Sequence, residues 1–222
     1  MEAIIALVVC FAFSFLCANL LKKAPVVFYV AFIVVGALFA SGAVEAYAPA
    51  LHLALIPYLR RASLAFGLFT VVMSVGALPE GNPVRKRITP IRGTLSLLGF
   101  VLVFVHVMGY AATYWVSVAN GVANPWIACG LIIGVVTSVL LIVLSVTSVS
   151  AVHRALDPRL WKNIQRLAYP FYLLMYFHLA AMLAPSSLVG GNSLANFVVY
   201  TVVVAAYSSA RLLRAKRDQS AT

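Results

Sequence analysis

Long apolar segments dominate this chain of 222 residues and limit its possible folds more than any other feature. Seven can be drawn, at approximately 3–21, 26–45, 62–79, 92–116, 126–149, 163–184 and 194–213. A helix needs about 20 apolar residues to cross the hydrocarbon core of a bilayer. Each segment is long enough, the third only just. The sequence therefore predicts an all-α polytopic membrane bundle of about seven transmembrane helices, with residues 1–222 forming a single transmembrane domain.

The composition supports this fold class and excludes others. Hydrophobic residues make up 64% of the chain and charged residues only 9%, against about 45–50% and about 25% in soluble domains. Too little chain lies outside the apolar segments for a soluble catalytic domain. None of the three cysteines, Cys10, Cys17 and Cys129, has the spacing of a metal cluster or a disulfide framework. We interpret them as small packing residues.

The basic residues predict the orientation of the chain. The net charge of +11 comes largely from clusters that follow the first, third, fifth and seventh segments: 22–23, 85–87, 153–166 and 211–217. Positive charge collects on the cytoplasmic side of membrane proteins, so the charge needs no nucleic-acid partner. We expect a bacterial inner-membrane protein with its N-terminus outside and its C-terminus in the cytoplasm. The first segment lacks a basic leader, which favours a retained span.

One pair of arginines departs from this pattern, because Arg60 and Arg61 fall on the predicted outer side. Two interpretations remain open. They are arginines at a span end whose charged heads reach the surface, or they hold an anion there.

Two of the four histidines lie inside apolar segments, where an ionisable group suggests a functional site. His106 is fourteen residues beyond Arg92, and His178 is twelve residues beyond Arg166. At the rise of an α-helix these spacings correspond to about 21 Å and about 18 Å from the inner side. The two imidazoles are therefore expected at nearly the same depth, where they could face each other.

Two neutral imidazoles on facing helices are what a low-spin b-type haem requires. Gly99 and Gly109 lie near the His106 face and lack the side chains that would block a flat macrocycle. An apolar wall is expected around His178, from Phe171, Leu174, Met175, Ala181 and Met182. The alternative is a haem-free scaffold or small transporter in which each histidine only hydrogen-bonds to a neighbour. A zinc or copper site is disfavoured because no third ligand occurs at that depth.

Three stretches carry a family resemblance: RASLAFGLF, IRGTLSLLGFVLVFVHVMGY and TSVSAVHRALDPRLWKNIQRLAYPFYLLMYFHL. They resemble the ferric reductase-like transmembrane domain and, within it, the haem-binding membrane subunit of the bacterial periplasmic methionine-sulfoxide reductase system. The resemblance covers residues 60–185. It implies a six-helix haem-binding core, to which the first segment is an N-terminal addition.

The same resemblance implies how many haems are present. The larger relatives, the NADPH oxidases, stack two haems with two histidines on each of two helices, spaced fourteen and thirteen residues apart. His106 and His178 match the outer pair, while the inner positions fall on Arg92 and Gln165, which are not usual iron ligands. We therefore expect one haem b per chain, near the outer face. Pro170 permits a kink between Gln165 and His178.

Other residues are candidates for contacts with the cofactor. Arg60 and Arg61 lie on the side where an outer haem would present its propionates. Tyr110 follows His106 by four residues and could contact a propionate or a quinone. It could equally be an aromatic residue of the interfacial belt.

The resemblance implies an electron-transfer subunit. Without an inner haem, a membrane quinol is the expected donor, and an extracytoplasmic protein or small substrate is the expected acceptor. Direct ferric or cupric reduction at the outer face would use the same haem. The chain has no GxGxxG motif, so it is not the NAD(P)H-using part of such a system. The outer-facing candidates to receive the quinol protons are Glu45, Tyr47, His52 and Tyr110.

Overall fold

The computed structural model describes residues 1–121 and 124–220 of the chain. It confirms the all-α fold, since every regular element among these residues is helical. In chain order the elements are α1 Glu2–Leu16, α2 Ala18–Lys23, α3 Pro25–Ala40, α4 Ala43–Tyr47, α5 Pro49–Leu55, α6 Ser63–Ala77, α7 Pro83–Ile88, the 3-10 helix η1 Thr89–Ile91, α8 Arg92–Ala119, α9 Pro125–Ser148, α10 Ser150–Ala155, α11 Pro158–Gln165, α12 Ala168–Ser187 and α13 Gly191–Ser220.

Each of the seven predicted segments overlaps one of the apolar helices. Four helical stretches are long and apolar enough to cross a membrane: Pro83–Ala111, Pro125–Ser148, Pro158–Ser187 and Gly191–Arg217. The other three segments form shorter apolar helices, α1, α3 and α6. At 15 residues, α1 and α6 extend only about 22 Å as helices. The chain is thus a polytopic helical membrane bundle, with three of its apolar helices shorter than a full span.

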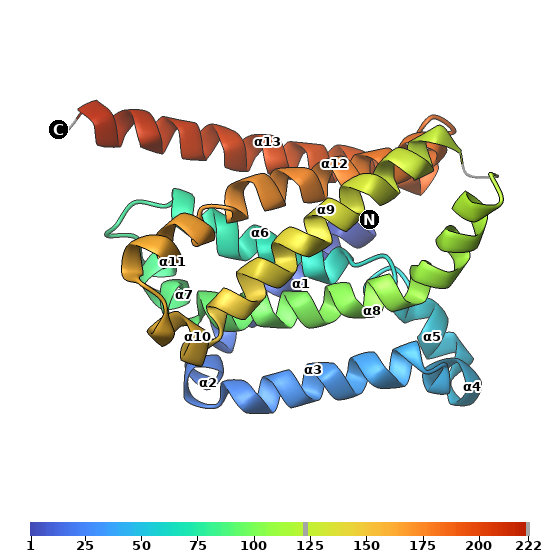
Figure 1. Ribbon diagram of the computed structural model, residues 1–222, viewed down its shortest axis with the longest axis horizontal. Coiled ribbons are helices and arrows are strands. Elements are labelled where there is room, and N and C mark those ends of the chain that lie inside the picture. The colour runs from blue at the N-terminus through green and yellow to red at the C-terminus, as the bar shows by residue number, and fades with distance from the viewer. Residues whose placement is uncertain (122–123, 221–222) are drawn as a thin grey trace.

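The connecting helices gather at two ends of the bundle (Figure 1). The short helices α2, α7, α10 and α11 and the C-terminus lie at one end, and α4 and α5 lie at the other. The first end carries the basic clusters predicted from the sequence, so we call it the basic end. The other is the α4–α5 end.

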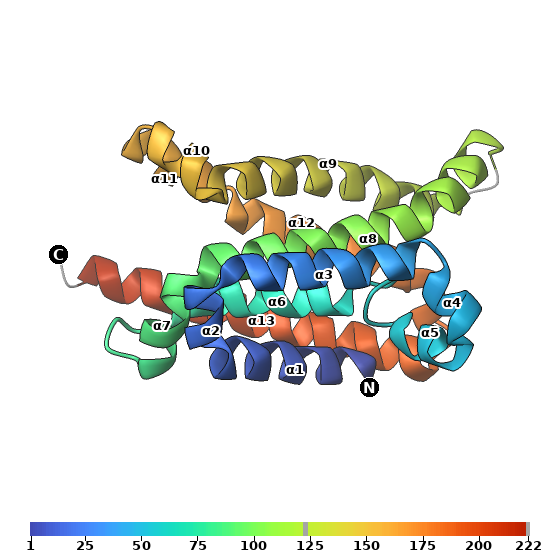
Figure 2. The same cartoon turned by 90° about the horizontal axis from the view of Figure 1, so that it is seen from below.

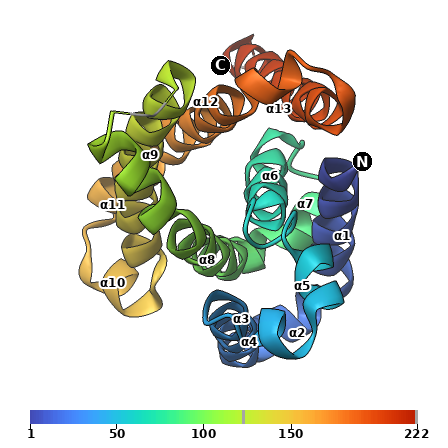
Figure 3. The same ribbon diagram turned by 90° about the vertical axis from the view of Figure 1, so that its right-hand side faces the viewer.

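Helix α6 is the most enclosed element of the bundle, because α1, α8 and α13 surround it (Figure 3). Eleven of its fifteen residues are buried, from Ser63 to Val75. A Cβ atom placed on Gly67 would lie 2.7 Å from the Cys10 sulfur and 3.1 Å from the Ala6 carbonyl oxygen. The first segment, expected as an addition to the core, is therefore closely packed against it through buried Cys10.

Helices α8 and α12 carry the two intramembrane histidines. Neither has the other as a main packing partner. Helix α8 lies between α6 and α3, whose course beside it is seen in Figure 2. Helix α12 packs most extensively against α9 and also against α13. The pair α8 and α12 is not among the closely packed ones. Their facing surfaces are therefore bridged by side chains.

The helical stretch Pro158–Ser187 is interrupted between α11 and α12, close to the kink expected at Pro170. Helix α11 ends at Gln165, a turn covers Arg166 and Leu167, and α12 begins at Ala168. Pro170 is the third residue of α12, where it has no amide hydrogen to donate. The Tyr169 amide donates to the Arg166 carbonyl oxygen at 3.1 Å, which closes the turn between the two helices. Gln165 and His178 therefore belong to separate helices.

Candidate functional site

The structure brings His106 and His178 together across the gap between α8 and α12. Their ring centroids are 6.1 Å apart and their ring planes are nearly perpendicular, at 89°. Both residues are half-buried. The depths estimated from helical rise agree with this arrangement, because both helices start at the basic end and carry their histidine a similar distance away from it.

Each imidazole is fixed by a hydrogen bond from Nδ1 to a backbone carbonyl. His106 Nδ1 lies 2.6 Å from the Arg60 carbonyl oxygen, and His178 Nδ1 lies 2.7 Å from the Gly130 carbonyl oxygen. A carbonyl oxygen only accepts hydrogen bonds, so Nδ1 carries the proton in both rings. In the neutral imidazole the lone pair is then on Nε2. This is the tautomer that binds a metal through Nε2, with a carbonyl as the partner of the other nitrogen.

The spacing of the rings also suits a single metal between them. An imidazole nitrogen lies about 2 Å from a bound metal and the ring centre about 1 Å farther, so two rings on opposite sides of one metal have centroids about 6 Å apart. The observed separation is 6.1 Å. The tautomers and the spacing both fit the axial ligands of a haem.

Two glycines of α9 support His178 and were not singled out from the sequence. Gly130 supplies the carbonyl that holds Nδ1. A Cβ atom on Gly134 would lie 2.8 Å from that same Nδ1 and 2.9 Å from Cε1. The two form the motif GLIIG, a small-xxx-small pattern typical of close helix contacts in membranes. That motif was the available sequence signal, because it marks where α9 lets α12 approach.

Gly99, which is expected to leave room for a flat macrocycle, lies against an aromatic ring of α6 in the structure. A Cβ atom on Gly99 would lie 2.8 Å from the Phe69 ring of α6. Phe69 in turn makes an edge-to-face contact with Phe171 of α12, with the ring centroids 5.0 Å apart. Gly99 and Phe171 each precede a histidine by seven residues, about two helical turns. Phe69 therefore fills the layer next to the histidine pair, and Gly99 serves helix packing there.

Gly109 is beside the histidine pair, together with Arg60 and Tyr110. The Arg60 side chain passes Gly109, where an added Cβ would lie 3.2 Å from Cγ. The guanidinium then lies over the Tyr110 ring, 4.9 Å from its centroid. Tyr110 also makes an edge-to-face contact with His106 at 5.2 Å. Arg60 thus contributes its carbonyl to one imidazole and its cationic group to the same neighbourhood.

The two adjacent arginines are not equivalent. Arg60 is half-buried, and its Nε is buried without a hydrogen-bond partner among the described residues. The Arg61 side chain is 60% exposed and pairs with Glu2 at 3.6 Å. Of the two arginines expected to hold an anion, Arg60 contacts the surroundings of His106, whereas Arg61 pairs with Glu2.

The two positions that would hold an inner haem have other surroundings. The Gln165 amide donates to the Thr147 hydroxyl at 3.1 Å, beside Trp161, whose indole donates to the Thr147 carbonyl at 3.0 Å. These bonds fasten α11 to the end of α9. Arg92 begins α8, and its Nε is buried without a partner in the described part of the chain.

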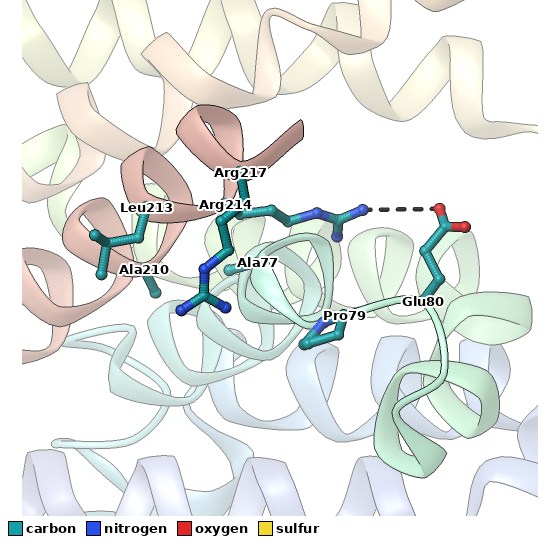
Figure 4. Close-up of a pocket in the computed structure, with 7 residues that line it drawn as sticks. All are labelled: Ala77, Pro79, Glu80, Ala210, Leu213, Arg214 and Arg217. Carbon is teal, nitrogen blue, oxygen red and sulfur yellow. Dashed lines mark ion pairs between the residues drawn. The ribbon is translucent and has the colours of Figure 1, made fainter. Parts of the chain in front are cut away.

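Cavities open at both ends of the bundle. At the basic end, a cavity of about 360 Å³ lies between α13 and the segment after α6 (Figure 4). There Arg214 donates to the carbonyls of Gly76 and Leu78 and lies 3.8 Å from the Glu80 carboxylate. At the α4–α5 end, a cavity of about 140 Å³ is lined by Phe39, Ala40, Gly42, Glu45, His52, Arg60, Val105 and Gly109. The second cavity shares Arg60 and Gly109 with the histidine site.

Fold and site together define a class: a helical membrane protein with two facing imidazoles in its apolar interior. The comparisons with known proteins assign the family. The family described as "Ferric reductase like transmembrane component" matches residues 58–176, more than half of the chain. This protein belongs to that family of ferric reductase-like transmembrane components. The matched region includes His106 and ends two residues before His178.

One relative is known by sequence, and its description gives no function. An uncharacterised protein of Treponema pallidum (strain Nichols) is 33% identical over 162 residues, which cover 71% of this chain and 44% of the relative. The chain therefore spans less than half of the length of that protein. No solved structure matches the chain.

Proposed function

We propose that this protein is a membrane electron-transfer component that binds one b-type haem through Nε2 of His106 and Nε2 of His178. The observation that carries the proposal is the pair of Nδ1 hydrogen bonds, which leave both Nε2 lone pairs available on rings spaced for one metal. When bound, haem supplies reversible one-electron chemistry. Membership of the ferric reductase-like family supports the same reading. We take residues 60–185 as the haem-binding core.

The surrounding chain would orient the ligands and keep water away. The carbonyls of Arg60 and Gly130 hold the imidazoles in one tautomer and raise the basicity of Nε2. Gly134 provides the space in which the His178 ring lies against α9. Phe69 and Phe171 form an apolar layer beside the pair.

Arg60 is the residue we assign to the haem propionates. Its guanidinium lies on the α4–α5 side of His106, over Tyr110, and its Nε has no protein partner. A buried N–H without a hydrogen bond is costly, so an anionic oxygen that accepts from this Nε would be stabilised by it. Tyr110 and Gly109 complete the surroundings of this guanidinium. Arg61 has no such role, because its partner is Glu2.

We infer a membrane quinol as the donor and an extracytoplasmic protein or small molecule as the acceptor. Arg92 and Gln165 replace the ligands of an inner haem, and Phe69 fills the layer between the histidine pair and the basic end. A cytoplasmic donor would then lack a second haem across the apolar core. The proposed setting is the bacterial inner membrane, with the basic end in the cytoplasm. Resemblance to the methionine-sulfoxide reductase subunit suggests a partner that carries molybdenum or flavin.

A second candidate function is direct ferric reduction at the outer face, which the family description favours. It uses the same histidine pair and differs only in the acceptor. Reduction of a ferric chelate by purified protein supplied with quinol, at a rate comparable with that of a partner protein, would favour it.

Absorption spectroscopy tests the proposed function. Purified protein is expected to show a b-type reduced-minus-oxidised spectrum, lost in both His106→Ala and His178→Ala. His153→Ala is the matched control, because His153 lies at the basic end against Trp161 and should leave the spectrum unchanged. A folded but colourless wild-type protein would instead support a haem-free scaffold or transporter.

A further inference from the structure

The small cavity at the α4–α5 end joins a titratable pair to the histidine site. Its wall is formed by the end of α3, by α4 and α5, and by α8. Its lining includes Glu45 and His52 as well as Arg60 and Gly109. Arg60 and Gly109 also belong to the surroundings of His106, whereas Glu45 and His52 take no part in the histidine site, so this pair needs a separate explanation.

His52 is held in a defined position with one nitrogen unused. Its ring stacks on Phe39, with centroids 4.8 Å apart and an angle of 11° between the planes. Its Nε2 lies 3.9 Å from the Glu45 carboxylate. Its Nδ1 is buried and has no hydrogen-bond partner in the described part of the structure. A buried nitrogen of this kind is costly unless a ligand pairs with it.

Glu45 links this histidine to the surface. The His52 side chain is 13% exposed, whereas the Glu45 side chain is 70% exposed. A proton received by the imidazole can pass to this carboxylate when the two side chains close from 3.9 Å to hydrogen-bond distance, and from there to water. The pair therefore forms a short path from the cavity to the α4–α5 face.

The cavity also adjoins the proposed haem ligands. Arg60 lines the cavity with its side chain and accepts the His106 hydrogen bond with its carbonyl. Gly109, one helical turn after His106, forms part of the same wall. A molecule in the cavity would therefore lie beside the residues that hold His106.

We propose that this cavity binds the hydroxylated ring of a membrane quinol and that His52, paired with Glu45, receives its hydroxyl proton. The inference rests on the proposed function, because the oxidant would be a ferric haem held by His106 and His178. Oxidation of one quinol to the quinone breaks two O–H bonds and releases two protons and two electrons. The protons leave one after the other through His52 and Glu45. The two electrons would leave one at a time to a ferric haem held by His106 and His178, with the acceptor removing the first electron before the second arrives.

Size and chemistry agree with this occupant. The cavity of about 140 Å³ has room for one substituted ring, and the apolar tail of a quinol would lie in the bilayer. Phe39, Ala40 and Val105 supply apolar contacts, and His52 supplies a hydrogen-bond partner. Tyr47, another candidate from the sequence, is 92% exposed and does not line the cavity.

Binding of a quinone probe tests the assignment separately from haem binding. The probe is an oxidised short-tail ubiquinone analogue, titrated by calorimetry into the haem-loaded full chain, with a menaquinone analogue in parallel. His52→Phe preserves the ring stack on Phe39 and removes both nitrogens. We expect it to weaken binding about tenfold, as loss of one buried hydrogen bond does. Tyr47→Phe, the matched control at the same end, should bind as the wild type does.

A second variant covers the case in which His52→Phe does not fold. Ala40→Leu adds side-chain volume at the cavity wall and should also weaken probe binding while the haem spectrum is retained. Wild-type affinity in both variants, with haem retained, would overturn the cavity assignment and leave the proposed function standing. Absence of haem from the wild-type protein would overturn the proposed function and this inference together.

Discussion

Substitution of Gly134 by alanine tests the support of His178 directly. The added Cβ would lie 2.8 Å from Nδ1 and 2.9 Å from Cε1 of the imidazole. Ordinary contact begins near 3.4 Å, so the ring has to withdraw from α9 by about 0.6 Å. The bond from Nδ1 to the Gly130 carbonyl, now 2.7 Å, would then exceed the normal upper limit of about 3.2 Å.

The expected size of the effect follows from that lost bond. A hydrogen bond of this kind contributes about 0.5–1.5 kcal/mol net. Loss of a partner behind a ligating histidine typically weakens metal binding about 10–100-fold. We therefore expect Gly134→Ala to bind haem at least about tenfold more weakly than the wild type, a difference of about 1.4 kcal/mol.

Gly130→Ala is the matched control on the same helix, because it keeps the backbone carbonyl that accepts from His178 Nδ1. Its added Cβ would lie 2.8 Å from the sulfur and 3.1 Å from Cγ of Met182, and 3.4 Å from the Ala181 Cβ. The flexible Met182 side chain can move aside. Both variants gain the same helix propensity, about 1 kcal/mol. Their difference in haem affinity therefore isolates the contact with the imidazole.

The assay is haem titration of the apoprotein, followed at the Soret band, with helix content measured by circular dichroism. The reasoning is refuted by wild-type haem affinity in Gly134→Ala, or by a larger loss in Gly130→Ala than in Gly134→Ala.

Two further predictions separate residues that the sequence grouped together. Arg60→Gln should weaken haem retention, whereas Arg61→Gln should leave it unchanged and lose only a surface ion pair worth about 0–1 kcal/mol; equal haem retention in the two variants would contradict the division. Gly99→Ala places a Cβ 2.8 Å from the Phe69 ring and should destabilise the protein by about 1–3 kcal/mol through overpacking. Thermal unfolding checks this, and Phe69→Leu in the same chain should recover most of the loss.

The fold followed from the sequence because bilayer crossing depends on apolar length and on charge placement. Apolar length predicted the seven segments, and the placement of the basic residues predicted the basic end. The lengths of α1 and α6 were overestimated, since the local breaks at Cys17 and after Ala77 depend on packing and turns. The interruption of α11 and α12 was foreseeable from Pro170, although its position at Arg166 and Leu167 was not.

The candidate site was only partly readable from the sequence. Helical rise along two separate segments was enough to pair His106 with His178. The partners of the imidazoles are backbone carbonyls of Arg60 and Gly130, which no side-chain pattern reveals. The contact of Gly99 with Phe69 of α6 was not foreseen, because a helical face can be reached from more than one neighbouring helix.

The cavity residues show a similar limit. Glu45 and His52 were two of several outer-facing candidates, without a reason to join them. The turn between α4 and α5 brings their side chains to 3.9 Å. The contact of the cavity with Arg60 and Gly109 depends on how α3 and α5 lie against α8, which is a tertiary property.

Haem stoichiometry per chain is the measurement that tests the central claim most directly. Protein purified in mild detergent is quantified by amino-acid analysis, and its haem is measured as the pyridine haemochrome. The histidine pair, with Arg92 and Gln165 at the alternative positions, predicts one haem b per chain. A value near two would contradict the single-site account, and a value near zero in folded protein would contradict haem binding altogether.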